Sequence, residues 1–143
     1  MSEFFAKLYS GFLSWIGYRD SLVVSVENIA LKADGVTAVA EFSLGKGNWI
    51  LIAKATLKAN SPSSNTTQLR LVATQGQDSK DDRALATVSQ LGYATLSLLL
   101  GTHVQSSADI RLEASTQGQD RSVDLKHVAI TAIKTDKLVL DRP

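Results

Sequence analysis

The sequence predicts an all-β protein, an antiparallel jelly-roll sandwich of about eight strands with a short N-terminal helical or extended aromatic arm. Beyond residue 21, apolar and polar side chains alternate with a period of two, as they do on strands that bury one face. Polar turn sequences separate the alternating runs, and no helical pattern lies between them. Strands joined in this way pair antiparallel.

The first 20 residues form a segment of different composition. Six of the nine aromatic residues lie within the first 18 positions, where the charged side chains are Glu3 and Lys7. Apolar residues at steps of three or four predict a helical arm that Gly11 weakens and Gly17 ends. We therefore divide the chain into an aromatic anchoring arm, residues 1–20, and a jelly-roll domain, residues 21–143. The predicted anchor residues are Phe4, Phe5, Leu8, Tyr9, Phe12, Trp15, Ile16 and Tyr18.

Alternation and turn signals place the strands of the second segment. The stretch 84–91 also fits a turn of helix, so both interpretations stay open there. Turns are expected at Asp34-Gly35, Gly45–Gly47, 61–65, 75–78, Gly101 and 117–120. The expected strands are 22–27, 36–44, 49–58, 67–74, 84–90, 93–100, 108–115 and 124–134.

One sequence pattern occurs twice. Residues 69–78 read LRLVATQGQD and residues 110–120 read IRLEASTQGQD. Alternation directs Arg70 and Arg111 to solvent and the flanking leucines inward, and predicts two equivalent hairpins in two facing sheets. A recurring favourable turn explains the repeat, and so do two similar loops that bind a ligand. The candidate ligand-loop residues are Gln75, Gln77, Asp78, Gln117, Gln119 and Asp120.

Composition argues against most reactive chemistry. The net charge is +1, which does not suit a protein that binds nucleic acid by neutralising phosphates, and there is no cysteine. His103, expected in a loop, and His127, expected in the last strand, lack metal-ligand spacing. The acidic residues near Asp81 fit a solvated turn better than a calcium site. No metal or cofactor is expected.

Catalytic motifs are absent as well. The sequence holds no G-x-S-x-G elbow and no phosphate-binding glycine loop. Glu27, Glu41 and Glu113 lie on alternating strands, and nothing in the sequence suggests that they converge as a pair of hydrolytic carboxylates would. We expect a protein that is not an enzyme.

Three segments carry a resemblance to a known family. They are GNWILIAKATL (47–57), LSLLLGTHV (96–104) and VAITAIKTDKL (128–138). Together they resemble the jelly-roll heads of the tumour-necrosis-factor and complement globular-head type, as found on bacteriophage virions. The resemblance implies a compact homotrimer that serves as a capsid decoration protein, head fibre or tail appendage.

Three functions remain open from the sequence. The first is a structural protein of the virion, assembled in the host cytoplasm, whose arm binds capsid or other virion proteins and whose many weak contacts sum by avidity. The alternative is a carbohydrate- or receptor-binding jelly-roll module. A membrane-associated protein is the third, and a polar arm face with Lys7 as its one cation argues against it.

Overall fold

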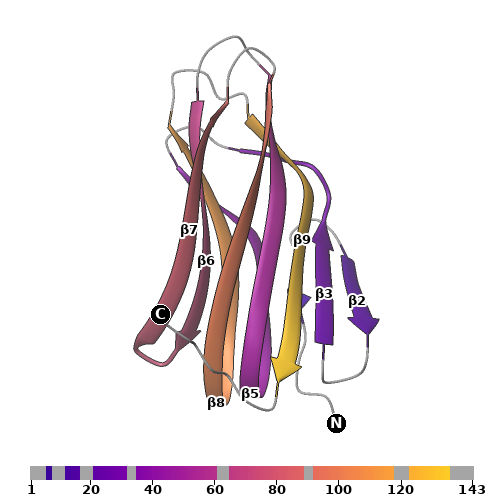
Figure 1. The fold of residues 1–143 in the computed structure, drawn as a ribbon, viewed down its shortest axis with the longest axis vertical. Coiled ribbons are helices and arrows are strands. Elements are labelled where there is room, and N and C mark those ends of the chain that lie inside the picture. Colours follow the sequence, from indigo (N-terminus) through magenta and orange to yellow (C-terminus); the bar gives the residue numbers. More distant parts are fainter. Residues whose placement is uncertain are drawn as a thin grey trace, which may run out of the picture.

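The computed structural model contains nine strands in the described part of the chain, and every pairing between them is antiparallel (Figure 1). It describes residues 21–31, 35–60, 65–88, 92–117 and 123–135 with their side chains, and the backbone of 6–7 and 12–16. The all-β jelly-roll class is confirmed. The strands are β1 (Ala6–Lys7), β2 (Phe12–Ile16), β3 (Ser21–Val26), β4 (Ile29–Ala30), β5 (Val36–Ala59), β6 (Asn65–Gln75), β7 (Asp78–Val88), β8 (Tyr93–Gln117) and β9 (Val123–Thr135).

The strands β5 and β8 are each as long as two predicted strands. The turns expected at Gly45–Gly47 and at Gly101 are therefore wrong. Gly101 stays in the ladder opposite Ile50, and a register shift between Gly45 and Gly47 bends β5 without ending it. The indole Nε1 of Trp49 donates to the carbonyl of Gly45 at 2.9 Å across this bend. A partner strand that continues past both glycines keeps their backbone in the sheet.

The β5–β8 pair belongs to two layers that share one core. Residues 48–59 of β5 pair with β9, whereas residues 109–117 of β8 pair with β6. We call β2, β3, β9, β5 (48–59) and β8 (93–104) the front layer, and β1, β5 (36–47), β8 (105–117), β6 and β7 the back layer (Figure 1).

Buried side chains from both layers form a single hydrophobic cluster. Leu51, Leu71, Leu112 and Ile130 are fully or almost fully buried in it. Burial of each such side chain contributes about 1.5–3 kcal/mol. Between β6 and β8, the buried hydroxyls of Thr67 and Thr116 bond to each other at 2.9 Å. This shared core fixes which face of each strand is left for solvent and ligands.

The repeated sequence lies in one layer. Leu71 of β6 is directly opposite Leu112 of β8, so the two copies are neighbouring antiparallel strands. The predicted hairpins in facing sheets are wrong, because β8 runs unbroken from Tyr93 and β6 pairs with β7 and β8. The orientation is confirmed, since the leucines are buried and both arginines reach the surface.

The N-terminal arm is extended where the structure describes it. β1 pairs with β5, and β2 pairs with β3 at the edge of the front layer. A helix is therefore the wrong interpretation for these two pieces. Edge strands offer unpaired backbone groups, and the aromatic and β-branched residues Phe12, Trp15 and Ile16 are types that favour strands. Phe4, Phe5, Leu8, Tyr9 and Tyr18 lie outside the described residues.

The structure bears on three further local predictions: it resolves one open choice and corrects two placements. Residues 84–88 belong to β7, which answers the open choice between strand and helix for that part, and 89–91 lie outside the described residues. His103 lies in β8 and not in a loop, with its Nδ1 2.6 Å from Oδ1 of Asn48. Asp81 and Asp82, expected in a turn, lie within β7.

Side chains from the back layer satisfy backbone groups at the β8 edge of the front layer. Gln75 donates from Nε2 to the carbonyl of His103 at 2.8 Å, and its Oε1 accepts from the N–H of Gln105 at 3.1 Å. Asp82 accepts from the N–H of Leu99 at 2.9 Å. These bonds join the two layers along one side of the sandwich.

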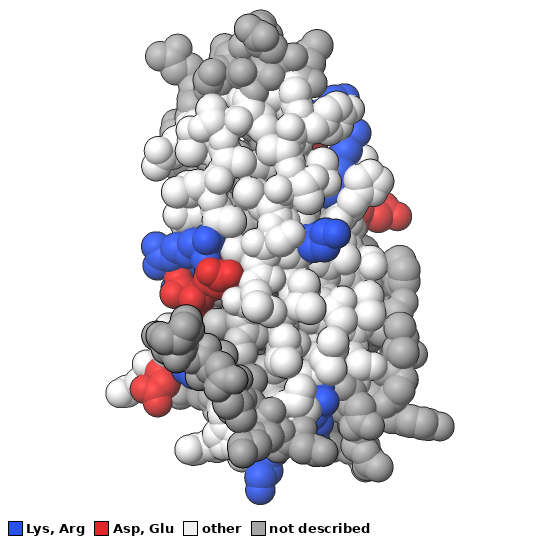
Figure 2. All heavy atoms as spheres, viewed as in Figure 1, with Lys and Arg blue, Asp and Glu red and all other residues white. Residues whose placement is uncertain are grey.

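The outward face of the front layer is poor in charge. Figure 2 shows mostly uncharged side chains over this face, with a few separate basic groups on it and acidic groups toward its margins. Leu99 is 63% exposed there and lies opposite Ile52. Among the described residues, the ion pairs all lie on the back layer.

Candidate functional site

A groove of ≈ 590 Å³ runs over the outward face of the back layer. Its walls come from four adjacent strands, β5, β8, β6 and β7. Directly opposite residues on neighbouring strands point to the same side, so the pairing register arranges the groove side chains in transverse rows. Neighbouring strands are about 4.7–4.9 Å apart, and successive rows are about 6.6 Å apart.

The first row, which we call the hydroxyl row, consists of Ser43, Asp109, Thr74 and Ser79 on four successive strands. Ser43 donates from Oγ to Oδ1 of Asp109 at 3.0 Å. In the described part of the chain, the hydroxyls of Thr74 and Ser79 have no protein partner. The row therefore presents three hydroxyls and one carboxylate to the groove.

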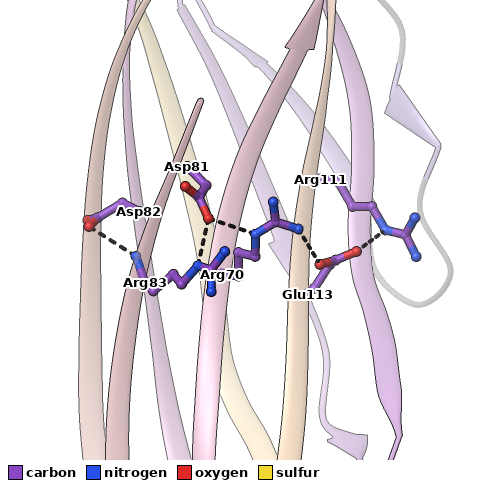
Figure 3. A network of polar contacts seen from close by, with 6 residues as sticks. All are labelled: Arg70, Asp81, Asp82, Arg83, Arg111 and Glu113. Carbon is purple, nitrogen blue, oxygen red and sulfur yellow. Dashed lines mark hydrogen bonds and ion pairs between the residues drawn. The ribbon is translucent and has the colours of Figure 1, made fainter. Parts of the chain in front are cut away.

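The next two rows contain a network of ion pairs (Figure 3). Arg70 is at its centre, with Nε 2.8 Å from Oδ2 of Asp81 and Nη1 3.2 Å from Oε1 of Glu113. Arg83 contacts the same Asp81 oxygen at 2.7 Å. Arg111 closes the other side, with Nε 3.0 Å from Oε2 of Glu113. The network crosses β7, β6 and β8.

Glu41 on β5 extends the network, with Oε1 3.6 Å from Nε of Arg111. Nothing in the sequence suggested that Glu41 and Glu113 lie close together, but in the structure both contact Arg111. The two carboxylates meet at one guanidinium because the register places Glu41 opposite Arg111, two residues from Glu113 on β8.

The ion pairs hold the charged side chains in one arrangement. Hydrogen bonds from Arg70 and then from Arg83 lower the pKa of Asp81, and the hydrogen bond to Asp81 is the largest cause that raises the pKa of Arg70. The side chains of Arg70 and Glu113 are 29% and 17% exposed, so water and ligands still reach them. Among the described residues, both ion pairs of Arg111 involve Nε, so its two terminal amino groups remain available as donors to a ligand.

Apolar surface lies beneath the charged groups. Val72 is paired with Asp81 on one side and with Arg111 on the other, and it is 6% exposed. The groove thus combines an apolar floor with fixed donors and acceptors. Among the described residues, no group of three or more potential metal ligands is found.

The candidate ligand-loop residues are not brought together. Gln75 and Asp78 flank the two-residue turn between β6 and β7, where Gly76 has a φ of 58°. Gln117 lies opposite Thr66 at the other end of β6. Gln75, Asp78 and Ser79 line a second hollow of ≈ 670 Å³ beside the bend of β8. Gln77 is exposed in the turn, and Gln119 and Asp120 lie outside the described residues.

The predicted anchor residues are only partly described. Phe12, Trp15 and Ile16 lie in β2, which pairs with β3 of the same chain. The described part of the chain holds no helix with the length and apolar character needed to span a bilayer.

Sequence reasoning missed the residues that form the groove. Alternation indicated that Arg70 and Arg111 point outward, and the repeat drew attention to both. Neither signal showed that β6 and β8 are neighbours. Without that pairing, Ser43, Asp109 and Glu113 are polar residues at unrelated positions of the sequence.

Comparisons with known proteins give distant structural likenesses. No family model matches the chain, and no curated protein matches its sequence. The C-terminal family 22 carbohydrate binding module of Clostridium thermocellum Xyn10B is 19% identical, with 95% of this chain and 88% of that chain covered and a TM-score of 0.44. The CBM22-1 xylan-binding domain from Paenibacillus barcinonensis Xyn10C is 14% identical, with 92% and 86% covered and a TM-score of 0.41.

A third likeness, to the xylan-binding module CBM15, has 8% identity, coverage of 95% and 94%, and a TM-score of 0.37. None of these comparisons supports the predicted link to phage capsid proteins, and nothing in the described structure indicates a virion protein or a trimer. Likenesses at these identities and TM-scores do not assign a function to this chain.

Proposed function

We propose that this protein is a non-catalytic binding module and that the groove on the back layer binds a saccharide. One observation carries the proposal: guanidinium donors, carboxylate acceptors and free hydroxyls stand in register over an apolar floor. A sugar ring presents the same combination, with hydroxyls that both donate and accept and an apolar C–H surface. The ion pairs hold Arg111 and Glu113 in place before a ligand arrives, which reduces the entropy lost on binding.

Charge argues for a ligand that is not an anion. Among the described residues, the charged groups lining the groove are two arginines and three carboxylates, Glu41, Asp109 and Glu113. Their sum is one negative charge, so phosphate groups or nucleic acid would meet net repulsion. A saccharide without acidic groups avoids this repulsion and can use both kinds of hydrogen-bonding group.

The same contacts argue for binding over catalysis. A hydrolase of glycosidic bonds needs one carboxyl group that donates a proton and a second that attacks or activates water. Glu41 and Glu113 both pair with the same guanidinium, that of Arg111, so they are not two separate carboxyl groups placed on either side of a glycosidic bond. In this arrangement both carboxylates can accept hydrogen bonds from sugar hydroxyls.

Affinity gel electrophoresis tests the proposal. The protein is run through gels that contain soluble xylan, which is the ligand named for two of the compared structures, glucomannan or mixed-linkage β-glucan. We expect at least one polysaccharide to retard the wild type. Arg111→Ala should weaken the apparent affinity about 12- to 150-fold, because a charged hydrogen bond contributes about 1.5–3 kcal/mol.

Arg83→Ala is the matched control. Arg83 belongs to the same ion-pair network and is 57% exposed, but it does not line the groove. It should bind like the wild type. Absence of retardation by every polysaccharide, or equal loss in both variants, would contradict the proposed site.

A further inference from the structure

Asp109 differs from the other charged residues of the groove. Within the described residues, Arg70, Arg111, Glu41 and Glu113 each take part in at least one ion pair. Asp109 takes part in none, and its side chain makes one hydrogen bond to these residues, the 3.0 Å bond that Oδ1 accepts from Ser43. Its Oδ2 has no protein donor in the part of the chain that the structure describes.

The position of Asp109 directs this carboxylate toward a ligand. It lies in the middle of the hydroxyl row, between Ser43 of β5 and Thr74 of β6, and all three line the groove. The neighbouring hydroxyls of Thr74 and Ser79 can accept hydrogen bonds as well as donate them. The Asp109 carboxylate is therefore flanked by the hydroxyls of Ser43 and Thr74, in the row farthest from Arg70 and next to the row of Arg111.

An ammonium group has the matching chemistry. It carries three N–H donors and a positive charge, so it can bond to Oδ2 of Asp109 and to one or two hydroxyls of the same row. It would also cancel the residual negative charge of the groove. A neutral hydroxyl at this place would gain the hydrogen bonds without the charge attraction.

We infer that the groove selects a saccharide that bears a free amino group, an amino sugar that is not acetylated, and that Asp109 is the residue that determines this selectivity. The inference rests on the proposed function and specifies its ligand class. Because Asp109 is exposed, the expected gain is small: an exposed ion pair contributes about 0.2–1 kcal/mol, which corresponds to about 1.4- to 5-fold in affinity.

The test compares two probes that differ at the amine. Isothermal titration calorimetry at about pH 5.5 and low salt measures the binding of a glucosamine hexamer and of its fully N-acetylated counterpart; amines are charged and carboxylates ionised under these conditions. We expect the glucosamine hexamer to bind about two- to fivefold more tightly. The preference should disappear in Asp109→Asn and shrink at about 0.5 M salt.

Asp78→Asn is the matched control for the charge change. Asp78 is the first residue of β7, beside the turn from β6, and does not line the groove, so this variant should keep the preference. Equal affinity of the two hexamers, a preference that survives Asp109→Asn, or binding of neither hexamer overturns the inference. If a neutral polysaccharide still retards the wild type, and more strongly than Arg111→Ala, only the inference fails and the proposed function stands.

Discussion

Replacement of Gly47 by alanine tests how β5 bends from one layer to the other. Gly47 has a φ of 144°, a conformation that side chains other than hydrogen rarely adopt. This strain costs about 1–3 kcal/mol. A Cβ at this position would also overlap the side chain of Lys134, whose Nζ lies 5.9 Å from the ring centre of Trp49. Lys134 would have to move, with a loss of up to about 1 kcal/mol of its attraction to the ring.

The two effects sum to an expected loss of about 1–4 kcal/mol in the free energy of unfolding. Urea denaturation followed by tryptophan fluorescence measures it. In a Lys134→Ala background the overlap is relieved, so Gly47→Ala should there cost only the strain, about 1–3 kcal/mol. The double-mutant cycle separates the two causes.

Gly45→Ala is the control within the same bend. An added Cβ at Gly45 meets no atom within 4 Å, and this glycine has no positive φ. Its stability should stay within about 1 kcal/mol of the wild type. If Gly47→Ala were as stable as Gly45→Ala, the conclusion that a strained bulge shapes this bend would be wrong.

Two further predictions concern the core and the ion-pair network. Leu71→Ala should lower the free energy of unfolding by about 2–5 kcal/mol, because Leu71 is fully buried. Leu99 is 63% exposed, so Leu99→Ala should change the free energy of unfolding by less than about 1 kcal/mol. Similar losses for the two variants in urea denaturation would contradict the assigned core. Arg70 and Arg83 lower the pKa of Asp81 below its ordinary value of 3.8. The ionised Asp81 therefore stabilises the folded state above pH 3.8, and this stabilisation is lost as the pH falls through the lower pKa of the folded state. The difference in stability between wild type and Asp81→Asn should therefore narrow from about pH 6 to about pH 2, and a constant difference would refute the pairing.

Much of the fold was predictable because alternation is a local signal. The inward and outward assignments at Leu71 and Arg70 needed only neighbouring residues, and the same holds for most strand positions. Whether Gly45-Lys46-Gly47 turns or bends was not local. It depends on residues 104–107 of β8, far along the chain, which continue the ladder past both glycines.

The candidate site was mostly hidden in the sequence for the same reason. Ser43, Thr74 and Asp109 form one row only because of the register of β5 with β8 and of β8 with β6. Period-two alternation shows that each residue points outward, but it does not show which strand lies beside it. The repeat marked Arg70 and Arg111 as equivalent positions, but it did not show that β6 and β8 pair, and this pairing brings both arginines to one surface.

The contacts of Gln75 and Asp82 with β8 have a consequence for how molecules of this protein meet one another. An open strand edge is a template on which a second chain can extend the sheet, and this is a common route to aggregation. Here amide and carboxylate groups occupy the N–H groups of Leu99 and Gln105 and the carbonyl of His103. Two polar side chains thereby protect β8 from intermolecular strand addition, at a position where the neighbouring surface residue, Leu99, would otherwise favour it.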